Sequence, residues 1–168
     1  MAITILSGMR LTPARLNALA PASARRATDA TVTNSTTLVD GLSVPVLANA
    51  EYDVEAMMIY EATVTGDMRV AFNWPSGSMT WGLIGLSTQA TAFTGDGTFP
   101  AFGAPAVDNA LLVGATGLGG QLTALARGTL VTGGSAGNLR LRFAQATAAA
   151  ATSAVLKAGS TLQVRRIA

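Results

Sequence analysis

Residues 52–74 read YDVEAMMIYEATVTGDMRVAFNW, and this stretch decides the fold class. The turn-forming Thr65-Gly66-Asp67 separates two runs in which apolar side chains occupy alternate positions: Tyr52, Val54, Ala56, Met58, Tyr60, Ala62 and Val64, then Met68, Val70, Phe72 and Trp74. Successive side chains of a β-strand point to opposite faces, so this period of two predicts two amphipathic strands. We expect the two strands to pair as a hairpin across the short turn.

Shorter runs of the same kind follow along the chain. Glycine-rich turns separate them, and they predict strands over residues 79–86, 110–113, 128–132, 139–143, 153–157 and 161–167. About eight or nine short strands with such turns are typical of an antiparallel β-sandwich of jelly-roll-like form, so we predict an all-β fold. Residues 87–120 are rich in glycine and are expected to form long loops.

The first part of the chain has a different pattern. Thr12 is a suitable N-cap, and Pro13 a suitable first residue, for a short helix over residues 14–20 that ends before Pro21. Residues 21–37 are small and polar, as in a linker. A helix this short needs a surface to lie on, so we assign residues 1–28 to an anchoring arm and residues 29–168 to the β-sandwich domain. The side chains expected to anchor the arm are Ile3, Ile5, Leu6, Arg10, Leu11, Arg15, Leu16 and Leu19.

Two residue types are missing from the 168 residues, because the chain has no histidine and no cysteine. It therefore cannot form a Ser-His-Asp triad, an imidazole general base, a disulfide or a metal site of His and Cys ligands. Asp53 and Glu55, two apart on one strand, suit a solvated strand face better than a calcium site or an acid–base pair. We predict that the protein is not an enzyme and holds no metal and no cofactor.

Two glycine-rich segments resemble ligand loops only in part. Thr94-Gly95-Asp96-Gly97-Thr98 lacks the further oxygen ligands of a calcium loop, and we interpret it as a turn. The run Gly114-Ala115-Thr116-Gly117-Leu118-Gly119-Gly120 is not followed by Lys-Ser or Lys-Thr. We interpret it as a loop and not as a phosphate cradle.

The 11 basic and 9 acidic residues are segregated along the chain. Residues 1–28 and 109–168 carry no acid, whereas residues 29–108 carry all nine acids and a single base, Arg69. This pattern predicts charge pairing within one fold or between copies of the chain. Arg165 and Arg166 occupy both faces of the last strand, so at least one is expected at a rim or an interface. The side chains expected to pair between subunits are Asp53, Glu55, Glu61, Arg140, Arg142 and Arg165.

The net charge of +2 is too small to indicate a nucleic-acid partner, and no apolar run is long enough to span a membrane. The two tryptophans are the remaining candidates for a binding surface. Trp74 is in phase with the inward side chains of its strand and is expected in the core. For Trp81 the sequence leaves two options open, a place in the core or a surface role in stacking on a sugar or anchoring an interface.

Three parts of the chain carry a resemblance to a known family. Residues 6–17, LSGMRLTPARLN, resemble the opening G-x-x-L-T-A-A-x-L-N, with Pro13 in place of its first alanine. Residues 42–52, LSVPVLANAEY, resemble L-x-x-x-V-x-A-N-A-x-Y. Residues 137–145 and 158–164, GNLRLRFAQ and AGSTLQV, resemble G-x-L-x-L-x-F-A-Q and A-G-S-x-L-x-V. In this order the segments resemble those of small β-rich structural proteins in the virions of tailed bacteriophages, especially phages of actinobacteria.

The resemblance implies a β-sandwich on the virion, often trimeric, that is assembled in the cytoplasm of the host bacterium. Its partner would be the major capsid protein if it is a capsid decoration or a head fibre, or tail proteins if it is a minor tail or baseplate component. The resemblance assigns no catalytic residue. The alternative from another class is a carbohydrate-binding adhesion module that contacts a host surface glycan through Trp74, Trp81 and the loops of residues 87–120.

Overall fold

The computed structural model describes residues 20–88, 101–103, 107–149 and 151–167, and all regular structure within them is β. The larger sheet has eight strands: β1 (Ala22–Arg25), β2 (Ala30–Thr33), β4 (Glu51–Ala62), β6 (Ser78–Ile84), β7 (Ala101–Gly103), β9 (Leu122–Val131), β11 (Ser153–Leu156) and β12 (Thr161–Arg166). The smaller sheet has four: β3 (Val39–Val46), β5 (Met68–Asn73), β8 (Leu111–Val113) and β10 (Gly137–Gln145). The described part thus has twelve strands where the sequence predicts eight or nine.

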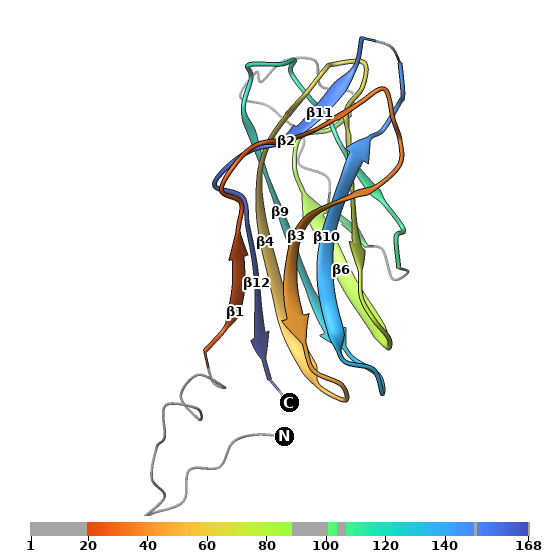
Figure 1. Cartoon of the computed structure of the whole chain (residues 1–168). Coiled ribbons are helices and arrows are strands. Elements are labelled where there is room, and N and C mark those ends of the chain that lie inside the picture. The colour runs from red at the N-terminus through yellow and green to blue at the C-terminus, as the bar shows by residue number, and fades with distance from the viewer. Residues whose placement is uncertain (1–19, 89–100, 104–106, 150, 168) are drawn as a thin grey trace, which may run out of the picture.

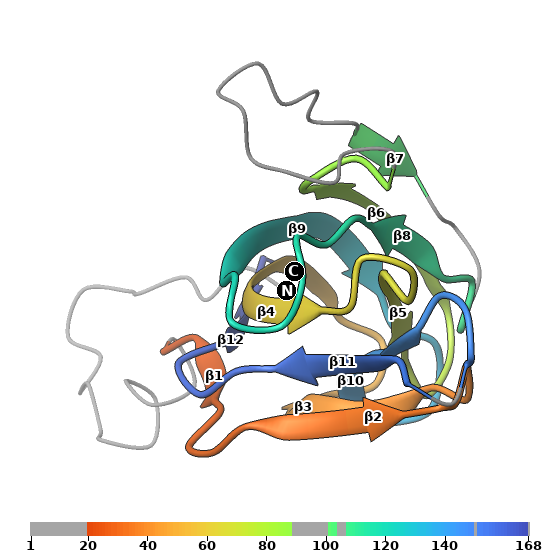
Figure 2. The same ribbon diagram turned by 90° about the horizontal axis from the view of Figure 1, so that it is seen from above.

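The two sheets form the two layers of a sandwich. The order in the larger sheet is β1-β12-β4-β9-β6-β7, and the order in the smaller is β3-β10-β5-β8. Figure 2, which looks down the strands, shows β9 and β6 on the opposite side of the molecule from β3 and β10. The ladders between the described strands are antiparallel, which confirms the predicted antiparallel all-β sandwich.

The predicted hairpin of residues 52–74 is wrong in its pairing. β4 pairs with β9, β11 and β12 in the larger sheet, whereas β5 pairs with β10 and β8 in the smaller one. In the turn between them, the N–H groups of Gly66 and Asp67 both donate to the Thr63 carbonyl at 2.9 Å. The turn carries the chain from one sheet to the other. Alternation specifies which side chains face inward, and two facing sheets bury both apolar sets as well as a hairpin would.

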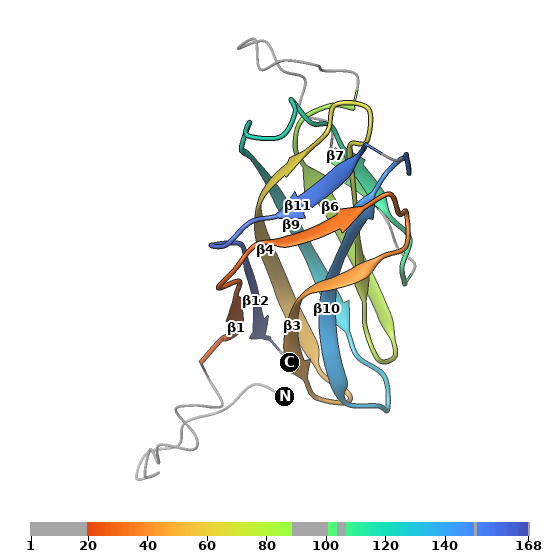
Figure 3. The same ribbon diagram turned by 45° about the horizontal axis from the view of Figure 1, so that its top comes forward.

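The small, polar residues predicted as a linker form β1 and β2 instead. β12 and β11 lie one after the other along the same edge of β4, and β1 and β2 pair with them one strand further out (Figure 3). At the corner between β1 and β2, the Arg26 guanidinium donates to the Gly41 carbonyl of β3 at 2.6 Å and so links the two sheets. Residues 22–28, assigned to the arm by sequence, are therefore part of the sandwich. The predicted helix and the eight anchoring side chains of the arm lie outside the described residues, except that Ala20 is described and is not helical.

Three short connections cross between the sheets at one end of the sandwich. They join β3 to β4, β5 to β6 and β9 to β10, and β1 begins and β12 ends at the same end (Figure 1). The buried Thr132 hydroxyl ties two of the connections together, because it accepts from the Ala50 N–H at 2.9 Å and donates to the Leu47 carbonyl at 2.7 Å. The opposite end carries the longer connections, residues 114–121 among them.

Both tryptophans belong to the apolar core between the sheets. Trp81 of β6 is 2% exposed, and its ring meets Phe72 of β5 edge to face, with centroids 4.9 Å apart. Trp81 lies opposite Gly128 in the register of β6 and β9, and a Cβ at Gly128 would lie 2.6 Å from the Trp81 Cβ. The core position predicted for Trp74 is confirmed. The surface-binding role of Trp81 is wrong, because its ring has no access to a ligand in solvent.

Candidate functional site

The outer face of the larger sheet brings together two of the predicted acids with arginines from neighbouring strands. The Glu55 carboxylate lies 2.6 Å from the Arg127 guanidinium, and Asp53 lies 3.1 Å from Arg165. Each pair joins side chains that are direct register partners, across β4 and β9 in the first case and β4 and β12 in the second. With Gln163 they line a shallow pocket of about 210 Å³. The guanidinium groups neutralise both carboxylates, so the pocket presents hydrogen-bonding groups with no net charge.

The third predicted acid, Glu61, lies at the corner where β4, β11 and β12 meet. The Lys157 ammonium is 3.2 Å from Glu61 and 2.6 Å from Asp29, which follows β1. The hydrogen bond from Lys157 lowers the pKa of Asp29, and the hydrogen bonds to Asp29 and Glu61 raise the pKa of Lys157. Glu61 also accepts from the Gly119 N–H at 2.8 Å, so this triad holds the loop that precedes β9. A second shallow pocket, of about 330 Å³, lies at the same corner beside Arg25 and Arg26.

The glycine-rich segment of residues 114–120 is a loop, and carboxylates and a phenol hold it. The Tyr60 hydroxyl donates to the Gly114 carbonyl at 2.7 Å, and the Asp67 carboxylate accepts from the Ala115 N–H at 3.0 Å. Burial raises the pKa of both Tyr60 and Asp67. An acidic surrounding of this kind repels phosphate, in agreement with the interpretation of this segment as a simple loop.

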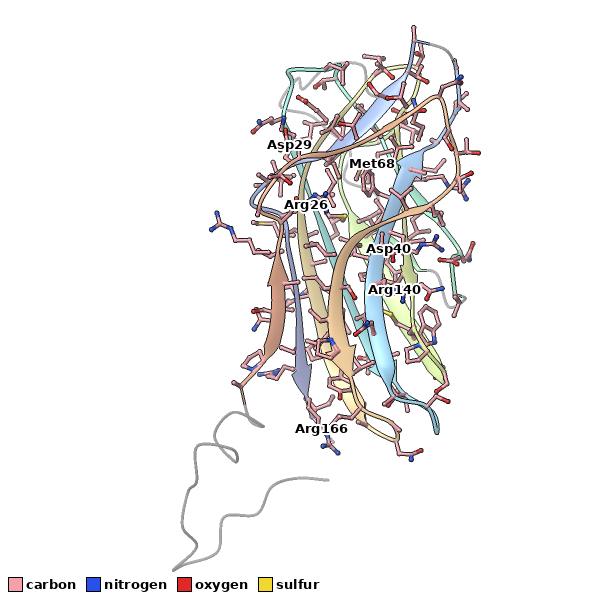
Figure 4. The ribbon with its side chains drawn as sticks, viewed as in Figure 1. Arg26, Asp29, Asp40, Met68, Arg140 and Arg166 are labelled. Carbon is pink, nitrogen blue, oxygen red and sulfur yellow. The ribbon has the colours of Figure 1, made fainter. Side chains whose placement is uncertain are left out.

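Of the side chains expected to form charge pairs, Arg140 and Arg142 do not meet Asp53, Glu55 or Glu61 within one chain. Both arginines lie on β10, on the outer face of the smaller sheet, where Asp40 is 3.6 Å from Arg140 and 3.2 Å from Arg142 (Figure 4). Arg142 is also 2.8 Å from Asp108. The two acidic partners come from β3 and from the connection before β8, and only the register of the sheet shows that they are near.

Arg165 and Arg166 end the last strand on the rim of the sandwich, as expected, and both are exposed; Figure 4 shows Arg166 at that end. Sequence reasoning missed five charged side chains of these clusters. They are Asp29, Asp40, Asp108, Arg127 and Lys157. Arg127 alternates with the buried Ala124 and Ala126, and this alternation was the one signal in the sequence that marked it as outward-facing.

Among the described residues, no group of three or more Asp or Glu side chains is placed to hold a metal ion. No described helix is long and apolar enough to cross a membrane. The calcium-like segment of residues 94–98 lies outside the described residues.

No family model and no curated protein matches the chain. Two of the similar solved structures are described as the structure of infectious bursal disease virus, one of the Gx strain and one of the Gt strain. The Gx strain structure is 13% identical in sequence, and the match covers 89% of this chain and 36% of the virus chain, with a TM-score of 0.22. The Gt strain structure is 15% identical in sequence, and the match covers all of this chain and 42% of the virus chain, with a TM-score of 0.21. The chain thus spans less than half the length of either, and similarity at these TM-scores carries no argument about function.

Proposed function

We propose that this chain is a structural component of a bacteriophage virion, attached to the particle surface through its N-terminal segment with the sandwich displayed outward. As a capsid decoration or head-fibre protein it would bind the major capsid protein. As a minor tail protein of the same fold it would bind tail proteins. Assembly in the cytoplasm of the host bacterium and a final location on the virion follow from the same proposal.

The observation that carries the proposal is the position of the chain ends. β1 begins beside the end of β12, with Ala22 opposite Val164, and the Ile167 N–H donates to the Glu51 carbonyl at 2.8 Å. Because β1 begins there, its link to residues 1–19 lies at the end of the sandwich that carries the short connections (Figure 1). Attachment through those residues points the longer connections away from the particle, which is the arrangement that a displayed protein requires.

The segments of the family resemblance that lie among the described residues, 42–52, 137–145 and 158–164, are on neighbouring strands of the sandwich. Residues 42–46 of β3 pair with residues 137–141 of β10, and residues 161–164 of β12 pair with residues 54–57 of β4. The resemblance thus covers neighbouring strands of both sheets and the connection between them. The described segments of the resemblance thus lie next to one another in the fold, and this supports the proposal.

The two tryptophans on which the carbohydrate-binding alternative depends are not accessible to a ligand. Trp74 and Trp81 are both buried, at 5% and 2% exposure, and neither presents a ring face for a sugar. No observation in the described residues favours that alternative over a structural role.

The proposal is tested by purifying phage particles from a lysate of the host on a density gradient and probing them with an antibody against the full-length protein. We expect the protein in the particle band and gold label on the particle surface, with label on heads or tails deciding between the two locations. The matched control is the purified protein run alone, which must stay out of that band. Recovery of the protein only in the soluble fractions of the lysate overturns the proposal.

A further inference from the structure

The outer face of the larger sheet carries a row of large apolar side chains that no other described residue of the chain covers. Met57, Leu125 and Ile84 are direct register neighbours across β4, β9 and β6. Leu125 is 43% exposed and Ile84 48% exposed, while the other face of the same strands already packs in the core. Three apolar side chains in register form a continuous strip, which differs from the single exposed apolar residues that are common on monomers.

A charged pair lies directly beside this strip. Glu55 and Arg127 are the next outward-facing residues along β4 and β9, and their side chains are 52% and 73% exposed. A carboxylate accepts several hydrogen bonds and a guanidinium donates five, so the contact within one chain leaves capacity on both groups. The surface is therefore an apolar strip bordered by groups that can still form charge-assisted hydrogen bonds.

We propose that this face binds a second copy of the chain, about a two-fold axis that runs parallel to the strands between β4 and β9. Such an axis places β4 of one copy over β9 of the other, so that each residue faces the register partner of its counterpart. Met57 then lies against Leu125 of the second copy, and Glu55 against Arg127 of the second copy. The next outward residue, Asp53, faces Thr129, so no like charges meet along the axis.

The size of the face predicts the strength of the pairing. The strands β12, β4, β9 and β6 lie side by side over the seven residues of β6. At about 4.8 Å between strands and 3.4 Å per residue this gives roughly 450 Å² per copy. About 900 Å² in total is at the small end of specific interfaces, so we expect a pair that forms in the micromolar range or above.

The orientation of the pair bears on the proposed function. An axis parallel to the strands leaves the chain ends of both copies at the same end, so that two N-terminal segments can reach one particle surface. The pairing itself does not depend on a virion location. Its test uses free protein, so the pairing can fail while the virion proposal stands, and the reverse.

The test is the mass of the full-length protein in solution, measured by light scattering and sedimentation over a range from micromolar to several hundred micromolar. We expect the mass to rise from 17.0 kDa towards about 34 kDa, the mass of a pair. A constant 17.0 kDa overturns the proposal. So does a species near three times 17.0 kDa, because a two-fold contact cannot close a ring of three copies.

Charge variants identify the face. Glu55→Arg and Arg127→Glu should each weaken self-association at least tenfold, because each places like charges opposite one another across the axis. A mixture of the two variants should associate, since one copy then presents two cations to two anions. Arg140→Glu is the matched control, an exposed arginine paired with an aspartate on the other sheet, and should leave the pairing unchanged. Loss of pairing in the control, or no association in the mixture of folded variants, overturns the proposal.

Discussion

Trp81→Ala removes the largest of the fully buried side chains in the described residues. Truncation of a buried Phe or Trp to Ala costs about 3–5 kcal/mol, through lost burial and the cavity that is left. The edge-to-face contact with Phe72, at 4.9 Å between centroids, adds about 0.5–1.5 kcal/mol to what is lost. Because this contact joins a strand of one sheet to a strand of the other, we expect a loss in the upper half of that range.

The Nε1 group of Trp81 makes a second variant informative. It is buried and has no hydrogen-bond partner among the described residues, which costs about 1–3 kcal/mol in the folded state. Trp81→Phe removes that unpaired donor and keeps an aromatic ring against Phe72. We expect it to lose less than half of the stability that Trp81→Ala loses.

Urea unfolding followed by circular dichroism measures both variants against the unchanged protein, and Thr80→Ala is the control. Thr80 is the exposed neighbour of Trp81 on the outer side of β6, and its loss should change the free energy of unfolding by no more than about 0.5 kcal/mol. A loss below about 1 kcal/mol for Trp81→Ala would refute the core position and return Trp81 to the list of surface-binding candidates.

Three further predictions concern a turn, an ion cluster and the N-terminal segment. Gly77 has a φ of +93°, and a Cβ there would collide with the Val131 carbonyl oxygen, so Gly77→Ala should cost at least about 2 kcal/mol in urea unfolding, whereas Gly134→Ala, with nothing within 4 Å, should be neutral. Asp29, whose folded pKa is lowered, stabilises the fold above pH 3.8 and loses that effect as the pH falls through the lowered value. Lys157, whose folded pKa is raised, stabilises the fold below pH 10.5 and loses that effect as the pH rises through the raised value. Lys157→Met should therefore flatten both the acidic and the basic flank of a plot of Tm against pH. An unchanged plot would contradict the role of the cluster. Deletion of residues 1–19 should leave the circular dichroism spectrum of the sandwich intact and abolish attachment to phage particles in a sedimentation assay, and attachment of the truncated protein would show that the segment is not the anchor.

The deletion ends at residue 19 because the structure shows that β1 begins at Ala22, which the sequence could not predict. Residues 22–28 are small and polar, and nothing in their composition distinguishes a linker from an outer strand. Residues 22–25 form β1 because they pair with β12, and the open edge of β12 is a property of the folded sheet. A deletion that ended at residue 28 would remove β1 together with the segment before it.

Alternation along single strands was the reliable signal. It identified the inward side chains of β4 and β5, and it predicted strands that match β10, β11 and β12 closely. Trp81 is in phase with the buried Met79 and Leu83, so the same signal was available for it. The period of two gives the face of a side chain but not the neighbour of its strand, which is why β4 and β5 were predicted to pair.

The charged clusters required the register between strands. Asp53 and Arg165 were both named as pairing residues, and they do meet, within one chain. The partners of Arg142 are Asp40 and Asp108, which lie about a hundred and about thirty residues away in sequence. Only the order β3-β10-β5-β8 brings these side chains together.

A cryo-electron microscopy reconstruction of the purified phage particle tests the central claim most directly. The account predicts surface density of the size of this sandwich, with the end that carries both chain ends turned towards the particle and the longer connections turned outward. A particle whose density contains no such sandwich, or one that holds the sandwich by the end with the longer connections, would contradict the account.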